Sequence, residues 1–165
     1  MDKRGKPIVI LYAEDDEEDR MLMQDALNES RLSNDLHTVE DGEELMEYLY
    51  RRGKYSYLNN APLPGLILLD LNMPRKDGRE ALNEIKSNPN LRRIPVVVMT
   101  TSKAEEDILR TYDLGVSGFI IKPVTFESLV NIVKTLGKYW FEIVELPSEL
   151  RISSLASKGI SPATK

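Results

Sequence analysis

The chain has 165 residues, 41% of them apolar and 30% charged, which is typical of one globular domain rather than a disordered chain. Its net charge of −5 comes without a basic tract, and this argues against a nucleic-acid surface. The absence of Cys and the single His37 exclude disulfides, thiolate metal sites and any site that needs two imidazoles. No apolar stretch approaches the roughly 18 residues of a membrane span, and the amino terminus lacks a secretion signal, so we expect a cytoplasmic protein with no membrane partner.

Short apolar runs alternate along the chain with segments of helical period. The runs predict five strands, at 7–13, 35–39, 65–70, 94–100 and 117–122. The periodic segments predict helices at 16–30, 42–52, 78–87 and 103–114, and a fifth from Thr125 onward. Because most of the strands are apolar at every position, the pattern indicates a parallel sheet that helices cover on both faces.

Two segments do not fit this alternation. The connection 52–65 is rich in Asn, Pro and Gly, which predicts a surface loop rather than a domain boundary. The last residues, 147–165, lack hydrophobic periodicity and are expected to form a flexible tail. We therefore expect one domain over 7–146, in which an extended carboxyl-terminal helix or arm follows the last strand.

Polar side chains stand where the predicted strands end. Glu14 and Asp15 follow the first strand, Asp70 ends the third, Thr100 ends the fourth and Lys122 ends the fifth. In an open parallel sheet, ligands bind outside the carboxyl ends of the strands, where the strand order reverses. The sequence therefore predicts that these groups meet at one edge of the sheet.

Each of these residues also has a structural explanation when it is taken alone. The acidic run 14–16 could cap the helix that follows it, since carboxylates stabilise the amino-terminal end of a helix. Asp70 could simply begin a turn, Thr100 could finish a strand as a β-branched residue, and Lys122 could be a solvated strand end. Their joint placement on one edge favours the functional interpretation.

Carboxylates that lie close together repel one another unless a cation neutralises them. A hard divalent ion with oxygen ligands, Mg²⁺ or Mn²⁺, fits such a set and leaves coordination positions for phosphoryl oxygens. A carboxylate is also a competent nucleophile towards phosphorus, and phosphoryl transfer mainly requires positioning and charge neutralisation. The residues therefore predict a metal-dependent aspartyl phosphate.

Four segments, "AEDD", "DLNMPRKDG", "MTTS" and "FIIKP", resemble the receiver domains of two-component response regulators, over about residues 7–136. This resemblance implies an α/β fold of the doubly wound (βα)5, flavodoxin-like type, with a five-stranded parallel sheet of order 2-1-3-4-5. It implies that Asp70 is the phosphoacceptor. The protein would be a signalling protein and not an enzyme, since it would catalyse only its own phosphorylation and dephosphorylation.

The resemblance also assigns the metal ligands. Asp15 and Asp70 would bind Mg²⁺ or Mn²⁺ directly, and Asn72 would bind it through its backbone carbonyl. Glu14, which replaces the commoner aspartate of an acidic pair, would contact the ion through water. These four residues make up the metal site that the resemblance implies.

A second group of residues would respond to the phosphoryl group. By the resemblance, Thr100 would hydrogen-bond to it and the ammonium of Lys122 would neutralise its charge. Phe119 stands where many receivers carry a switching tyrosine. Because Phe119 has no hydroxyl, a switch formed with Thr100 would have to work through burial of the ring, and the alternative role of Phe119 is packing.

The long loop before Asp70 and the ending "KYWFEIVELP" resemble single-domain regulators that serve bacterial and cyanobacterial phytochrome histidine kinases. The partners implied are a sensor histidine kinase of this type and an unknown downstream protein that is contacted directly. The apolar ending could fold back over its own domain, but the resemblance favours a homodimer. The residues expected at that interface are Tyr139, Trp140, Phe141, Ile143 and Val144.

Two other classes remain as alternatives. A phosphotransferase of the haloacid-dehalogenase type also ends a strand in a nucleophilic aspartate, but it needs a second aspartate where this chain has Asn72. An amide cannot shuttle a proton at neutral pH, so rapid turnover is not expected. The other alternative is a receiver-like adaptor that is never phosphorylated, and the presence of all five site groups argues against it.

Overall fold

The computed structural model describes residues 8–32, 34–101, 104–122 and 125–138. Five strands are present: β1 (Ile10–Ala13), β2 (Leu36–Val39), β3 (Leu66–Leu69), β4 (Val96–Thr100) and β5 (Gly118–Ile121). The α-helices are α1 (Glu17–Glu29), α2 (Gly42–Tyr50), α3 (Gly78–Ser87), α4 (Glu105–Asp113) and α5 (Phe126–Leu136). Every predicted strand and helix is therefore confirmed, with ends that differ from the expected ones by a few residues.

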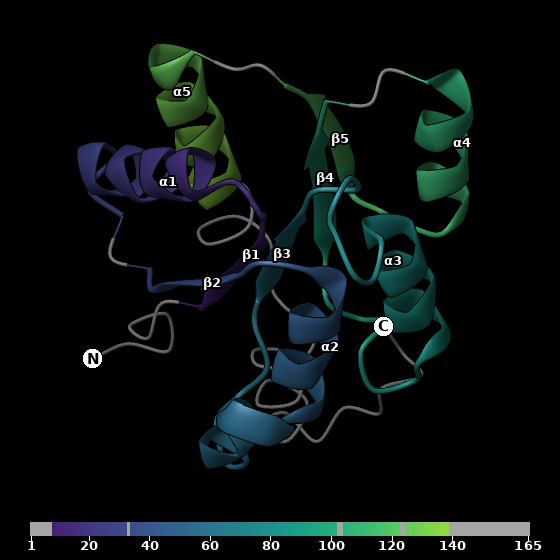
Figure 1. The fold of residues 1–165 in the computed structure, drawn as a ribbon. Helices are drawn as coiled ribbons and strands as arrows, with labels where there is room; N and C mark the ends of the chain where they lie inside the picture. The colour runs from purple at the N-terminus through teal and green to yellow at the C-terminus, as the bar shows by residue number, and fades with distance from the viewer. Residues whose placement is uncertain (1–7, 33, 102–103, 123–124, 139–165) are drawn as a thin grey trace, which may run out of the picture.

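The five strands form one parallel sheet in the order β2-β1-β3-β4-β5 (Figure 1). This order confirms the doubly wound fold that the resemblance to receiver domains implies. After β2 the chain returns past β1 to form β3, so the order reverses between β1 and β3. The carboxyl ends of these two strands are consequently the place where such a sheet binds ligands.

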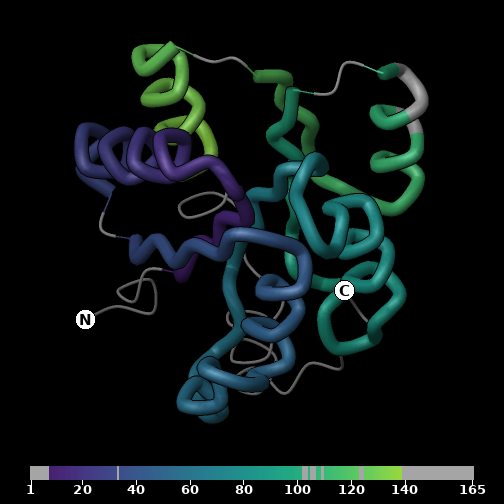
Figure 2. The backbone as a smooth tube through the Cα atoms, viewed as in Figure 1, coloured from purple at the N-terminus to yellow at the C-terminus, as the bar shows by residue number. Residues whose placement is uncertain are grey.

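Helices cover both faces of the sheet, α1 and α5 on one face and α2, α3 and α4 on the other (Figures 1 and 2). Successive strand residues point to opposite faces. In β1, Leu11 and Ala13 pack towards α2 and α3, whereas Ile10 and Tyr12 pack towards α1 and α5. Both faces are therefore apolar, which explains why the strands show no alternation in the sequence.

Polar caps fix where the helices begin. The side chains of Asp16, Asp41, Asp77 and Thr125 each accept a backbone N–H in the first turn of α1, α2, α3 and α5, respectively. Such caps satisfy amide groups that have no partner inside a helix. Because each helix leaves the sheet from the carboxyl end of a strand, these caps also shape the loops that surround the site.

The connection between α2 and β3 contains a short 3₁₀-helix, η1 (Gly53–Leu58), which the sequence did not predict. None of its residues is buried, so the connection lies at the surface as expected. Its Tyr55 packs edge-to-face on Tyr48 with ring centroids 5.1 Å apart and donates a hydrogen bond of 2.5 Å to Glu44. Six residues are too few to show a helical period, and side chains of α2 hold them in place.

Helix α5 ends at Leu136, and the predicted arm with its five interface residues, Tyr139, Trp140, Phe141, Ile143 and Val144, lies outside the described residues, as does the tail 147–165. Among the helices described, none combines the length and the apolar character that crossing a bilayer requires.

Candidate functional site

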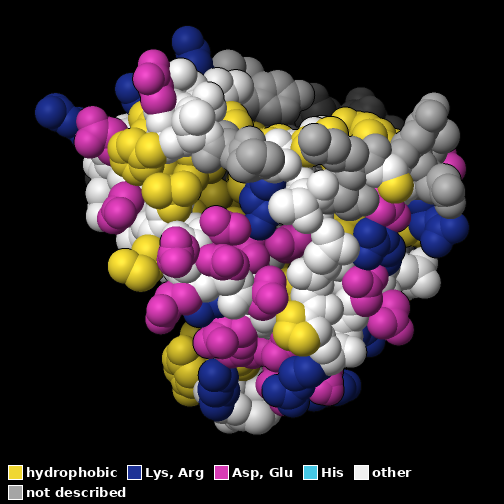
Figure 3. All heavy atoms as spheres, turned by 45° about the horizontal axis from the view of Figure 1, so that its top comes forward, with side chains coloured by type: hydrophobic (Ala, Val, Ile, Leu, Met, Phe, Trp, Pro, Cys, Tyr) yellow, Lys and Arg dark blue, Asp and Glu magenta, His cyan; other side chains and the backbone are white. Residues whose placement is uncertain are grey.

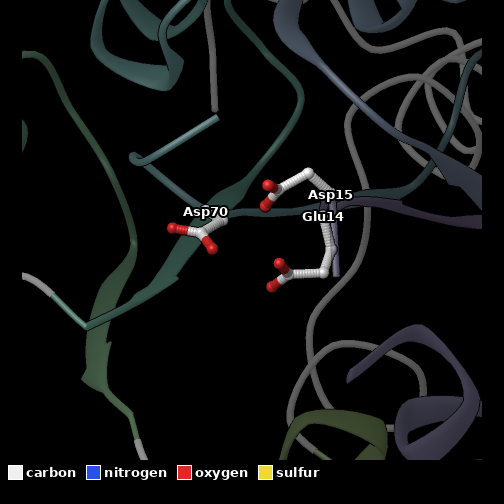
Figure 4. A group of neighbouring side chains, drawn as sticks. All are labelled: Glu14, Asp15 and Asp70. Atoms are coloured by element: carbon white, nitrogen blue, oxygen red, sulfur yellow. The ribbon is translucent and has the colours of Figure 1, made fainter. Parts of the chain in front are cut away.

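Three carboxylates meet at the ends of β1 and β3 (Figure 4). The register pairs Ala13 of β1 with Leu69 of β3, so the next residues, Glu14 and Asp70, leave the sheet side by side. Ligand oxygens of Glu14, Asp15 and Asp70 all lie within 4.8 Å of one another. Glu14 and Asp70 are buried, with 1% and 4% of their surface exposed, whereas Asp15 is exposed. The structure thus brings these three residues together at the edge where the sequence predicts a site.

Lys122, which follows β5, reaches across the sheet edge to this cluster. Its Nζ donates hydrogen bonds to Glu14 Oε1 at 2.6 Å, Asp19 Oδ2 at 2.8 Å and Asp70 Oδ2 at 3.2 Å. The side chain is only 11% exposed, so water screens these contacts weakly. One ammonium therefore balances part of the negative charge contributed by two strand ends and the first turn of α1.

Asp19 belongs to this site although the sequence did not single it out. It lies in the first turn of α1, where acidic residues are explained by capping and by the helix dipole. The signal that could have found it is its place in the first turn of the helix that follows the first strand, because that end of the helix lies at the same edge of the sheet as the site.

Burial raises the pKa of Glu14 above its ordinary value near 4.5, and the hydrogen bond from Lys122 offsets this only in part. Burial alone would lower the pKa of Lys122, but its hydrogen bonds to Asp19 and Glu14 outweigh that effect, so the pKa lies above the ordinary 10.5. Lys122 therefore stays charged at neutral pH. The protonation of Glu14 instead depends on how much positive charge the site contains.

The residues of the acidic run 14–16 have two different roles, helix capping and participation in the site, both of which the sequence left open. Asp16 is the N-cap of α1, since its Oδ1 accepts the amide of Asp19 at 3.0 Å. Glu14 instead accepts hydrogen bonds from Lys122 and from the buried hydroxyl of Tyr12 at 3.2 Å. Capping therefore accounts for the third residue of the run, and the first two face Asp70.

Asn72 and Thr100 complete the surroundings of Asp70. The backbone amide of Asn72 donates to Asp70 Oδ1 at 3.0 Å, whereas Lys122 donates to Oδ2, so the two oxygens of this carboxylate have separate donors. The side-chain Nδ2 of Asn72 donates to Oγ1 of Thr100 at 3.2 Å and of Thr101 at 3.3 Å. Thr100 is fully buried at the end of β4, so its hydroxyl is held beside the loop that follows Asp70.

Gly78 allows this loop to close tightly. A Cβ atom on Gly78 would lie 2.2 Å from the carbonyl oxygen of Asp70 and 2.6 Å from the Cα of Leu71. Real Cβ atoms do not approach backbone atoms that closely. The glycine of "KDG" is therefore required by the close approach of α3 to the end of β3.

Phe119 lies on β5, opposite Val98 of β4, and its half-buried ring packs on the face covered by α2 and α3. Thr100 follows Val98 by two residues, and residues two apart in a strand point to the same face. Phe119 and Thr100 consequently share one face of the sheet on neighbouring strands, which is the arrangement that a coupled pair requires.

The donor set fits a divalent cation. It consists of carboxylate oxygens only, and hard cations such as Mg²⁺ and Mn²⁺ prefer oxygen ligands. Acidic side chains also gather across the face seen in Figure 3, where they make the approach to the site negative. Glu14, Asp15 and Asp70 are thus the residues that could hold such an ion.

A parallel sheet of this order, with acidic residues after β1 and β3, a hydroxyl at the end of β4 and a lysine after β5, defines the class of receiver domains. A model of the response regulator receiver domain matches residues 10–134, and the chain belongs to that family. Receiver domains bind a divalent metal, in agreement with the acidic cluster.

Relatives support this assignment. The chain is 44% identical over 147 residues to the response regulator Rcp1 of Synechocystis sp., covering 89% of this chain and 98% of Rcp1. It is 36% identical to the probable methanogenesis regulatory protein FilR2 of Methanothrix harundinacea, covering 81% of this chain and 84% of the relative. The relatives thus match the chain over most of its length and most of theirs.

Solved structures show the same relationship. The phosphorylated cyanobacterial phytochrome response regulator RcpA is 46% identical, with a TM-score of 0.78, covering 86% of this chain and 99% of RcpA. The Mn²⁺-bound form of Rcp1 is 45% identical, with a TM-score of 0.76 and the same coverage. The chain is therefore a receiver-domain response regulator similar to the phytochrome response regulators, and none of these matches favours a haloacid-dehalogenase enzyme.

Proposed function

We propose that this response regulator accepts a phosphoryl group on Asp70 from a sensor histidine kinase. The observation that carries the proposal is the environment of the Asp70 carboxylate, which lies beside Glu14 and Asp15 and accepts hydrogen bonds from Asn72 and Lys122. In the transfer, an oxygen of Asp70 forms a bond to phosphorus while the bond from phosphorus to the kinase imidazole breaks. The leaving imidazole nitrogen keeps the bonding electrons and takes up a proton.

The residues around Asp70 have distinct roles in this proposal. Glu14, Asp15, Asp70 and the backbone carbonyl of Asn72 would hold Mg²⁺ or Mn²⁺, which supplies positive charge opposite the phosphoryl oxygens. Lys122 neutralises the product from the β5 side. Its role is supported by its 3.2 Å contact with Asp70 and by its positive charge at neutral pH.

Thr100 and Phe119 form the proposed switch. The hydroxyl of Thr100, which accepts a hydrogen bond from Asn72, would turn to donate to a phosphoryl oxygen. A change at Thr100 alters the packing on the face that it shares with Phe119, and the half-buried ring of Phe119 can then become more buried. The signal is read as a change of surface shape by a downstream protein.

The names of the relatives suggest the kinase. RcpA is described as a phytochrome response regulator, and we extend this to the present chain, with a phytochrome-type histidine kinase as its partner in the cytoplasm. We further propose that the domain extends over 7–146 and is followed by a flexible tail at 147–165. Its apolar arm would pair two copies in a homodimer through Tyr139, Trp140, Phe141, Ile143 and Val144.

Mass spectrometry after incubation with acetyl phosphate and Mg²⁺ tests the central proposal. The unsubstituted chain should gain the mass of one phosphoryl group, and Asp70→Asn should gain none. Asp25→Asn, a change at an exposed carboxylate of α1, serves as the matched control and should be phosphorylated like the unsubstituted chain. Rapid release of phosphate without an accumulated adduct would instead indicate a phosphotransferase. Neither an adduct nor released phosphate would indicate an adaptor, and a full adduct on Asp70→Asn would reject the assignment.

A further inference from the structure

Arg79 on α3 forms a two-pronged ion pair with Asp107 on α4. Its Nε donates to Oδ1 of Asp107 at 2.7 Å, and its Nη2 donates to Oδ2 at 2.6 Å. This parallel geometry is specific to a guanidinium group facing a carboxylate. The side chains are 29% and 15% exposed, so the pair is better shielded from water than a surface ion pair.

The remaining nitrogen of Arg79 reaches the loop that follows β3. Nη1 donates to the carbonyl of Leu71 and to Oδ1 of Asn72, each at 3.4 Å, and to Oδ1 of Asp77 at 3.1 Å. Asn72 in turn donates to the hydroxyl of Thr100. One guanidinium group therefore contacts both the loop at the site and a helix that follows a different strand.

Helix α4 buries little surface among the side chains that the structure describes. Of these, Thr111 is buried, Asp107 and Ile108 are half-buried, and Tyr112 is 48% exposed. By comparison, α3 buries four of its residues, Gly78, Ala81, Leu82 and Ile85. Because the side chains described on α4 bury little surface, the shielded ion pair of Asp107 with Arg79 is one of the contacts that fix the position of this helix.

We propose that Arg79 is a positioning residue. Through its ion pair with Asp107, it couples the geometry of the Leu71–Asn72 loop to the position of α4 on the sheet. The inference rests on the proposed function, because that loop is proposed to hold a divalent cation through Asn72. If the position of α4 with the ion pair formed favours the loop geometry that binds the cation, then cation binding favours that position of α4 by the same factor. The coupling gives Asp70 a route to α4 that does not pass through Phe119.

Titration calorimetry of the full chain with Mn²⁺ tests the coupling at the site. Asp107→Asn should weaken Mn²⁺ binding by about fivefold or more, which is the lower end of typical coupling factors. Asp113→Asn removes the same charge from the exposed end of the same helix, and it should bind Mn²⁺ nearly as well as the unsubstituted chain. The comparison separates the ion pair from general electrostatics.

Arg79→Lys provides an independent variant, since it keeps the charge but cannot form the two-pronged contact. It should weaken Mn²⁺ binding as Asp107→Asn does, and the double variant should bind no more weakly than either single variant. In metal-free protein, amide hydrogen exchange should be faster in α4 of both single variants and unchanged in α3. A purely global loss of stability would accelerate exchange in both helices.

The outcomes distinguish this inference from the proposed function. If Asp107→Asn and Arg79→Lys bind Mn²⁺ as tightly as Asp113→Asn, while the unsubstituted chain is phosphorylated on Asp70, the coupling is wrong and the proposed function stands. If the unsubstituted chain neither binds Mn²⁺ nor takes up a phosphoryl group, both are wrong. Equal acceleration of exchange in α3 and α4 would also reject the coupling.

Discussion

Replacement of Lys122 by Met keeps most of the side-chain volume and removes the ammonium from the site. The substitution leaves two buried carboxylates, Glu14 and Asp70, without the cation that lies 2.6 Å and 3.2 Å away. Asp19 also loses a partner, but its side chain is 36% exposed and can be solvated. We therefore expect the cost to come from Glu14 and Asp70.

Removal of one partner from a buried ion pair costs about 3–5 kcal/mol, because the other charge stays buried. In a chain of this size each kcal/mol shifts the melting temperature by roughly 2–4 °C, so Lys122→Met should melt some 6–20 °C lower at pH 8. The variant also removes the hydrogen bond that partly offsets the effect of burial on the pKa of Glu14, so this pKa rises further.

The sign of the pH dependence follows from that shift. A carboxyl group whose pKa is higher in the folded than in the unfolded state stabilises the fold at low pH, and this stabilisation is lost as the pH rises through the folded-state pKa. The loss of stability of Lys122→Met relative to the unsubstituted chain should therefore be small at acidic pH and should grow towards pH 8.

Thermal melts followed by circular dichroism, in buffer with a chelator at pH 5.5 and pH 8, provide the measurement. Lys134→Met is the matched control, because Lys134 is exposed on α5 and its loss should leave the melting temperature nearly unchanged. Added Mn²⁺ should recover part of the loss in Lys122→Met. If the two variants melt together at pH 8, the carboxylates are already compensated without Lys122 and the reasoning is wrong.

Two further predictions concern packing and assembly. Gly78→Ala should lower the free energy of unfolding by roughly 3 kcal/mol, and with it the melting temperature, because the new Cβ would overpack against Asp70. Gly118→Ala is the control and should melt like the unsubstituted chain, because its Cβ would meet only atoms 3.8 Å away. Equal melting temperatures of the two variants would contradict the close approach of α3. The full chain should sediment as a dimer at micromolar concentration and a chain truncated after Gly137 as a monomer, so two monomers would exclude the proposed homodimer.

The fold could be predicted because its signals are local and repeated. Five apolar runs separated by periodic segments are enough to imply a parallel sheet with helices on both faces, and the structure confirms this. The residues of the site could be placed because parallel strands put their carboxyl ends on one edge of the sheet. The meeting of Glu14, Asp70 and Lys122 could therefore be predicted without knowledge of side-chain geometry.

The remaining features depend on contacts that the sequence does not encode locally. Asp19 meets Lys122 across 103 positions of the chain, and Arg79 meets Asp107 across 28. Three of these residues, Asp19, Arg79 and Asp107, lie on helices and look like ordinary solvated charges, so neither periodicity nor composition distinguishes them. The helix η1 was missed for a different reason, since a single exposed 3₁₀ segment has no buried face.

The charge balance of the site implies an order of events. Four carboxylates, Glu14, Asp15, Asp19 and Asp70, lie around the ammonium of Lys122. Arg20 adds one guanidinium group, which donates to the backbone carbonyl of Glu14 at 2.8 Å, so acidic groups still outnumber basic ones among the described residues of the metal-free site. A phosphodonor is also an anion, and like charges at close range disfavour its approach. In the proposed transfer to Asp70, the carboxylates would therefore gain a further positive charge before the donor comes within bonding distance. Lys122 alone cannot supply that charge, because its hydrogen bonds to Glu14 and Asp19 already compensate part of the cluster.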